Sequence, residues 1–92
     1  MRYSSDILDQ IRQRLSLVDE VRSSVNGLKR KGKFWWACCP FHQEKSPSFH
    51  VREDDGHYHC FGCGAHGDIF TFAMEAKGLT FTDAVEQLAD KA

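Results

Sequence analysis

The chain lacks any apolar run long enough to cross a membrane, and its first residues lack the apolar segment of a secretory signal. It also has no internal repeat, no low-complexity stretch and no carboxylate cluster of the kind that holds catalytic magnesium. These absences lead us to expect an intracellular protein whose thiols stay reduced, without a two-metal catalytic site. The hydrophobic share of 41% and the charged share of 27% suit a single globular domain over residues 1–92.

Cysteine is scarce, with four residues, and two of them, Cys38 and Cys39, are adjacent. Adjacent cysteines cannot easily serve two separate disulfides, and a reducing compartment disfavours disulfides altogether. Two pairs of ligand-type residues instead have a two-residue gap, Cys39 with His42 and Cys60 with Cys63, and seventeen residues lie between the pairs. Such a gap lets a tight turn aim both side chains at one point. The two pairs therefore predict a tetrahedral structural site for one Zn2+.

Two other chemistries explain these residues less well. A redox Cys-x2-Cys motif would account for Cys60 and Cys63 but would leave the matching pair of Cys39 and His42 unexplained. A catalytic zinc site needs an open coordination position, which four protein ligands do not leave. Cys38 does not have the two-residue gap to His42. We predict that Cys38 lies on a strand and packs against the core, because free cysteine is usually buried.

The order of apolar and capping residues predicts an α+β fold. Helices are expected after the capping residues Ser4 or Ser5, Ser16, Asp68 and Thr80. Strands are expected at residues 28–31, 34–38, 48–52 and 57–60. The expected architecture is a small antiparallel β-sheet zinc ribbon flanked by N- and C-terminal helices. The metal would reinforce it, because a chain of 92 residues has a small core.

A net charge of −1 hides an uneven distribution of charge. Residues 27–52 carry six basic side chains against Glu44, whereas residues 53–92 carry eight acidic side chains against Lys77 and Lys91. A basic middle segment points to an anionic partner. The alternative is a solvated hairpin whose lysines serve only solubility, and charge alone does not decide between the two.

The residues around both ligand pairs stand in a distinctive order. Residues 37–49 read ACCPFHQEKSPSF, and residues 58–68 read YHCFGCGAHGD. In these strings and in both flanks the chain closely resembles the N-terminal zinc-binding domain of bacterial DNA primases (DnaG type), and the resemblance spans almost all 92 residues. The departures from the family are mild and lie at Ser46 and at Trp35-Trp36.

The resemblance implies a piece of an enzyme and not a whole one. In this family the zinc domain comes first, and an RNA polymerase domain and a helicase-binding domain follow, so residues 1–92 would have no polymerase active site. The domain would bind single-stranded template DNA and help to select where RNA primer synthesis starts, in the bacterial cytoplasm at the replication fork. Its metal ligands would be Cys39, His42, Cys60 and Cys63. The replicative helicase would be reached only through other parts of the primase.

Proteins hold single-stranded DNA with basic side chains that neutralise its phosphates and with aromatic side chains that stack on its bases. In this chain the basic segment is interleaved with aromatic residues. Strand alternation predicts Phe49 in the core and one of Trp35 and Trp36 facing outward. Phe61 lies between the ligands of the second pair and could equally shield the metal. The predicted DNA contacts are Lys31, Lys33, Trp35, Trp36, Lys45 and Arg52.

The sequence is also compatible with a function of a different class, which is protein docking. The domain would then be a zinc-stapled docking module that contacts the polymerase domain of the same or a neighbouring primase chain, a role that the acidic C-terminal helices suit. Salt separates the two functions. Added salt should weaken DNA binding steeply, but it should leave a mostly apolar docking contact unchanged.

Overall fold

The computed structural model describes residues 3–41 and 47–92. Over these ranges the chain forms four helices and a five-stranded antiparallel sheet, which confirms the predicted α+β class. The elements are α1 (Ser5–Arg14), α2 (Leu17–Ser24), β1 (Lys29–Lys31), β2 (Phe34–Ala37), β3 (Phe49–Arg52), β4 (His57–Cys60), β5 (His66–Gly67), α3 (Ile69–Lys77) and α4 (Phe81–Lys91). No helix among the described residues is both long and apolar enough to cross a membrane.

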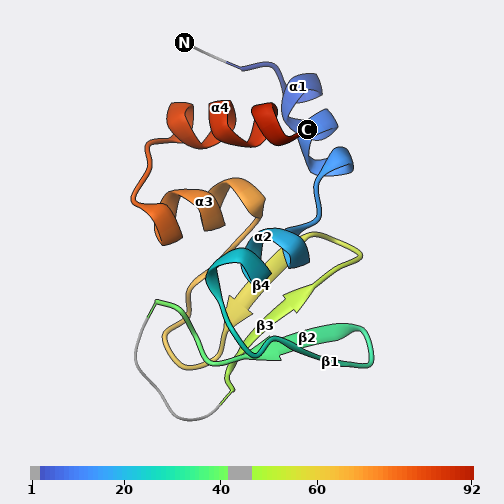
Figure 1. Ribbon diagram of the computed structural model, residues 1–92, viewed down its shortest axis with the longest axis vertical. Helices are drawn as coiled ribbons and strands as arrows, with labels where there is room; N and C mark the ends of the chain where they lie inside the picture. Colours follow the sequence, from blue (N-terminus) through green and yellow to red (C-terminus); the bar gives the residue numbers. More distant parts are fainter. Residues whose placement is uncertain (1–2, 42–46) are drawn as a thin grey trace.

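The molecule is elongated, 40 × 26 × 19 Å, and its elements follow the long axis (Figure 1). Helices α1 and α4 lie together at one end, α2 and α3 occupy the middle, and the sheet forms the other end. Lys91 of α4 reaches α2, where its Nζ lies 2.8 Å from a carboxylate oxygen of Glu20. Helices thus cover one face of the sheet, where α2 contacts β3.

Each helix begins at a predicted capping residue. The hydroxyl oxygens of Ser4, Ser16 and Thr80 each accept a hydrogen bond from the backbone N–H three residues later. Asp68 caps α3 more strongly, because its Oδ1 accepts bonds of 3.0 Å from the backbone N–H groups of both Phe70 and Thr71. The predicted helix starts are thus confirmed.

The sheet is a simple meander, with the strands in the order β1-β2-β3-β4-β5. Its inner face, which the helices cover, carries Phe49, Val51 and Tyr58, and these side chains are at most 1% exposed. The prediction that Phe49 belongs to the core is confirmed. Strand alternation places the neighbours of these residues on the opposite face, the outer face of the sheet.

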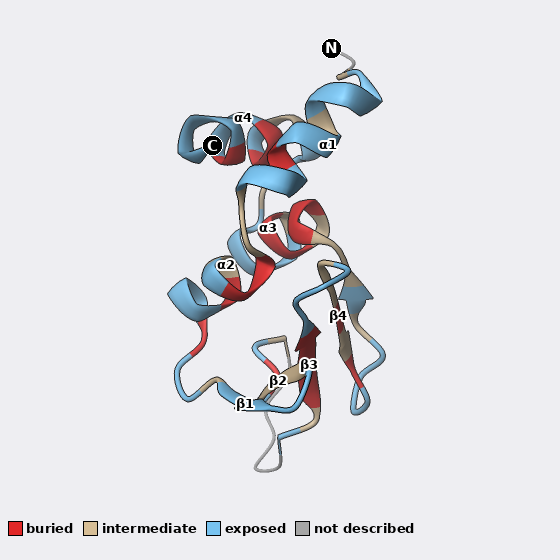
Figure 2. Ribbon diagram, turned by 90° about the vertical axis from the view of Figure 1, so that its right-hand side faces the viewer, coloured by how far each residue is buried: buried red, intermediate tan, exposed pale blue. Residues whose placement is uncertain are grey.

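A single cluster of buried residues joins the helices to the sheet. It contains Val21 of α2, Phe72 of α3 and Leu88 of α4 together with the inner face of the sheet. Figure 2 shows the buried residues gathered where α2, α3 and β3 face one another and where α1 meets α4. The described residues therefore share one continuous buried core.

Two sequence predictions need correction in the sheet. Cys38 is exposed and lies beyond the end of β2, whereas we predicted a strand residue packed in the core. The reason is alternation: Ala37 takes the inner position, 4% exposed, so the next side chain points away. Strand β5 was not predicted, because two residues, His66 and Gly67, are too few to show a periodic pattern.

Candidate functional site

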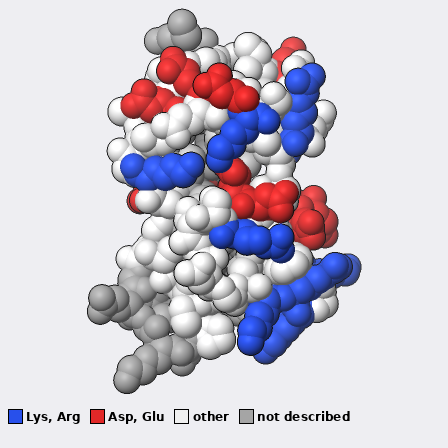
Figure 3. All heavy atoms as spheres, in the orientation of Figure 1, with Lys and Arg blue, Asp and Glu red and all other residues white. Residues whose placement is uncertain are grey.

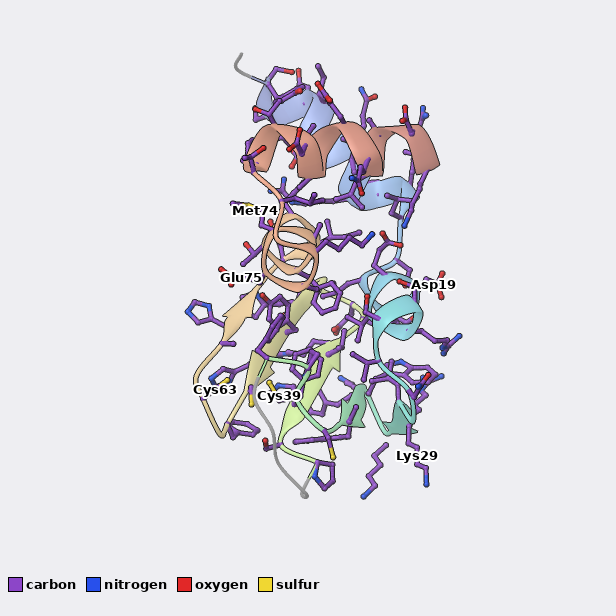
Figure 4. The ribbon with its side chains drawn as sticks, turned by 60° about the vertical axis from the view of Figure 1, so that its left-hand side comes forward. Asp19, Lys29, Cys39, Cys63, Met74 and Glu75 are labelled. Atoms are coloured by element: carbon purple, nitrogen blue, oxygen red, sulfur yellow. The ribbon has the colours of Figure 1, made fainter. Side chains whose placement is uncertain are left out.

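Three of the predicted metal ligands meet at one end of the sheet. Cys39 follows β2, Cys60 ends β4, and Cys63 lies in the turn after β4. Their sulfur atoms all lie within 4.8 Å of one another, and Figure 4 shows the side chains of Cys39 and Cys63 side by side. Cys39 and Cys60 are buried, while Cys63 is exposed. Sequence positions that are 24 residues apart are thus brought to one point by the pairing of neighbouring strands.

The spacing of the sulfur atoms fits zinc. Cys39 Sγ and Cys63 Sγ are 3.8 Å apart. Two thiolates on a tetrahedral zinc ion, each with a Zn–S bond of about 2.3 Å, stand about 3.8 Å apart. His42 lies outside the described residues, so the four-ligand set stays a prediction. Among the residues that the structure describes, no other group of three or more His, Cys, Asp or Glu side chains is arranged to hold a metal.

Backbone hydrogen bonds shape the turn that carries Cys60 and Cys63. The N–H of Cys60 donates to the Ala65 carbonyl at 2.8 Å, and the N–H of Gly64 donates back to the Cys60 carbonyl at 2.9 Å. Gly64 has a φ of 80°, a left-handed conformation that side chains other than glycine rarely adopt. This tight closure aims both sulfur atoms at the same point.

The two buried thiols, Cys39 and Cys60, differ in pKa. Burial raises the pKa of Cys39 to about 12. Burial also opposes ionisation of Cys60. However, hydrogen bonds from Ser48 and from the backbone of Cys63 and Gly62 outweigh it and lower the pKa of Cys60 to about 7. Cys60 is therefore the first of the pair to become a thiolate, which is the form that binds metal.

The outer face of the sheet gathers basic and aromatic side chains. In the strand register Lys29 pairs with Trp36, and Lys31 pairs with Phe34. Phe34 in turn pairs with Arg52, and Trp36 pairs with His50, so these six side chains share the outer face. His57 and His59 of β4 and His66 of β5 continue it. Figure 3 shows Lys and Arg side chains gathered at the sheet end, over β1 and β2.

The two tryptophans have opposite orientations. Trp36 stands on the outer face, with its ring 5.0 Å from that of His50. Trp35 packs against the core from the inner face, where its Nε1 donates to Glu53 at 3.3 Å and the Arg22 guanidinium lies 5.0 Å from its ring. Trp36 is thus the tryptophan that a ligand on the outer face would meet.

The predicted DNA contacts do not all lie together. Lys31, Trp36 and Arg52 share the outer face, whereas Trp35 is on the inner one. Lys33 is exposed in the turn between β1 and β2, and Lys45 lies outside the described residues. Lys29 and His50 also lie on the outer face, although they were not among the predicted contacts. Both follow from strand alternation once the pairing partners are known.

Comparison with known proteins gives consistent matches. A family model described as the CHC2 zinc finger matches residues 3–92. The DNA primase of Chlamydia pneumoniae is 47% identical over 89 residues, and that of Neisseria meningitidis serogroup A is 47% identical over 87 residues. These matches cover 97% and 95% of this chain but only 15% of each relative. The crystal structure of the Aquifex aeolicus primase, with its zinc-binding and RNA polymerase domains, matches with a TM-score of 0.85 and 34% identity over 97% of this chain and 22% of that one.

Proposed function

Since this chain belongs to the CHC2 zinc finger family, as a zinc-binding domain of DNA primase, we propose that it binds single-stranded template DNA on the outer face of its sheet. The resemblance seen in the sequence is thereby confirmed at the level of the family. The chain spans about 15% of the length of the relatives it matches. The activity and the partners of a whole primase are accordingly part of the proposal.

One observation carries the DNA-binding function. The strand register gathers Lys29, Lys31 and Arg52 with the rings of Phe34 and Trp36 on a single face that no described helix covers. Cationic side chains neutralise phosphates, and exposed rings stack on bases, which together are what a single strand requires. The opposite face is apolar and buried and is unavailable to a ligand.

The metal proposal is one structural Zn2+ held by Cys39, His42, Cys60 and Cys63. The three described sulfur atoms fit it in spacing and in chemistry. When bound, the ion supplies a cross-link between the chain after β2 and the chain after β4. The role of the protein is to present these turns at one end of the sheet, so the ion would fix the strands that form the outer face.

Within a longer primase this domain would help to select the initiation site of the RNA primer. Primer synthesis itself would belong to an RNA polymerase domain, and the contact with the replicative helicase to a further domain. Residues 1–92 would then be a non-catalytic module that acts in the bacterial cytoplasm at the replication fork.

Salt dependence tests the DNA-binding function. Each phosphate contact to a single strand contributes a slope of about −0.7 in log affinity against log salt. Lys31→Ala and Arg52→Ala should each weaken binding to oligonucleotides of any sequence and make the slope shallower by about 0.7. Fluorescence anisotropy with a labelled single strand at several salt concentrations measures both quantities.

Lys77→Ala is the matched control, because Lys77 is an exposed lysine at the end of α3, away from the sheet. It should leave the slope unchanged. A flat salt response of the unaltered chain, or an equal effect of all three substitutions, would contradict DNA binding on the outer face.

A separate observation, an exposed aromatic side chain at the helical end, supports the docking function. At the helical end Phe81 is 41% exposed, and its ring lies 6.3 Å from that of Tyr3. An apolar surface there suits a contact with the polymerase domain of the same or a neighbouring primase chain. Phe81→Ala should weaken that contact with little dependence on salt, and this response would distinguish docking from DNA binding.

A further inference from the structure

Phe61 has an unusual position for a large apolar residue. It is 64% exposed, although it lies between Cys60 and Cys63, two of the proposed metal ligands. A ring that shields a metal would pack over the sulfur atoms, but this ring stacks on the outer face of the sheet. Its centroid lies 5.0 Å from that of His50, with 23° between the ring planes, and 6.1 Å from that of Trp36, with 29° between the planes.

His50 forms the base of this ring cluster. Its side chain is 7% exposed, and its ring lies 5.0 Å from Trp36. Burial lowers the pKa of His50, and the nearby His59 and Arg52 lower it further, which favours the neutral ring. Its Nδ1 has no hydrogen-bond partner among the described residues. Three rings from β2, β3 and the metal turn thus form one stack, and Phe61 is its exposed member.

The position of Phe61 depends on the turn that carries it. Its backbone N–H donates to the Ser48 carbonyl at 3.0 Å, which joins the turn to the residue before β3. The turn is closed by the hydrogen bonds of Cys60 with Ala65 and Gly64. A metal held by Cys60 and Cys63 would restrain both ends of the two-residue segment that contains Phe61.

The chemistry of the face selects a nucleic acid as the occupant. Lys29, Lys31 and Arg52 lie on the same face as the ring stack. An apolar protein partner would have to bury these cations without compensation, which is costly. A single strand provides phosphates for the cations and unpaired bases for the exposed ring.

We propose that the exposed side of the Phe61 ring receives an unpaired base of single-stranded DNA, and that the same ring couples metal binding to DNA binding. This inference rests on the proposed function and identifies which residue of the outer face stacks on the base. The coupling follows because DNA favours the position of Phe61 that the metal-bound turn provides.

The first test compares Phe61→Ala with Ile7→Ala, which removes most of a 46% exposed apolar side chain of α1 at the helical end. Loss of one base stack of roughly 1–3 kcal/mol corresponds to a fivefold to more than hundredfold loss of affinity. Phe61→Ala should lose that much affinity for a single strand while the salt slope stays unchanged, and Phe61→Trp should restore binding. Ile7→Ala should bind the single strand as the unaltered chain does.

A duplex of the same sequence is the matched ligand, because it offers phosphates but no unpaired base. Phe61→Ala should not change binding to the duplex. If the unaltered chain binds the single strand with the expected salt slope and Phe61→Ala binds equally well, the stacking assignment is wrong while the proposed function stands. If the unaltered chain does not bind the single strand, both are wrong.

The second test uses the reciprocity of coupled binding, since DNA must raise zinc affinity by the same factor as zinc raises DNA affinity. Zinc affinity is measured by competition with a chelator, with and without a short single strand. The oligonucleotide should raise zinc affinity in the unaltered chain and raise it less in Phe61→Ala. An equal rise in both, or no rise in either, overturns the coupling.

Discussion

Cys38 and Cys39 are neighbours in the chain but have opposite surroundings. Cys39 is buried within the group of three sulfur atoms, and Cys38 is exposed. We expect Cys39→Ser, Cys60→Ser and Cys63→Ser each to lose zinc and much of the folded structure, because structural zinc binding contributes on the order of 10 kcal/mol in small zinc peptides. Metal analysis and circular dichroism of the purified variants measure the two effects.

Cys38→Ser is the control for this series, because it makes the same chemical change one residue away. It should keep one tightly bound zinc per chain and a normal spectrum. Loss of zinc with Cys38→Ser and retention with Cys39→Ser would show that the ligand assignment is wrong.

At the scale of single residues, the sequence predicts features that depend on local spacing, but it does not predict features that depend on how the strands pair. The pairing of Cys60 with Cys63 depends on two intervening residues, so it could be predicted. The side on which Trp36 lies, and its contact with His50 and Phe61, depend on which strands pair and in which register. Strand alternation predicted that one of Trp35 and Trp36 faces outward. The strand register in the structure shows that it is Trp36.

Among the described helices, α3 has the N-cap with the most hydrogen bonds. Asp68 accepts two backbone hydrogen bonds there, and its Oδ2 also lies 3.1 Å from a guanidinium nitrogen of Arg12 in α1. Burial alone would raise the pKa of Asp68, but the hydrogen bonds from Thr71 and the pairing with Arg12 outweigh it and hold the pKa below its usual range. One carboxylate thus begins one helix and connects it to another.

This lowered pKa predicts a pH-dependent contribution to stability. A carboxyl group whose pKa is lower in the folded chain stabilises the fold at pH values above its unfolded pKa of about 3.9, and the effect is lost as the pH falls through the folded pKa. Asp68→Asn keeps a capping side chain without the charge. It should cost about 1 kcal/mol or less at pH 7, and the difference from the unaltered chain should narrow only as the pH falls below about 3.9 and through the lower folded pKa.

Denaturant unfolding of both chains from pH 7 to pH 3 measures this difference. Zinc content is measured at each pH, and the comparison uses the pH values at which both chains still hold the metal, because metal binding and folding are coupled. Glu86→Gln, at an exposed position of α4, is the control and should show no such convergence. A constant difference across the pH range would mean that the charge of Asp68 does not stabilise α3.

The elements that the sequence predicted best are those with local signals. Capping residues predicted all four helix starts, and aromatic or alternating runs predicted β2, β3 and β4. The end of β2 was placed one residue too far, at Cys38, because the sequence pattern does not show where hydrogen bonding to β3 stops. Strand β5 depends on its partner: Gly67 lies opposite Tyr58, and a Cβ there would come within 2.5 Å of Thr71.

At the scale of the whole molecule, we expect the 92-residue chain to synthesise no RNA primer. Polymerisation of nucleotides needs carboxylates that hold two magnesium ions, and residues 1–92 show no such cluster in sequence. Incubation of the purified chain with single-stranded template, ribonucleotides and magnesium, followed by separation of labelled products, checks this. Primer synthesis that persists through further purification would contradict the assignment as a non-catalytic module.

The strand order of the sheet also has a kinetic consequence. Every strand pairs with the strand that follows it in the chain, so each pairing closes only a short loop. Contacts between residues close in sequence give fast folding, whereas the proposed metal joins turns that are more than twenty residues apart. The hairpins should therefore form transiently within milliseconds of dilution from denaturant, and they should become stable only when the ion binds. Zinc uptake would then follow as a slower step whose rate depends on the concentration of free metal.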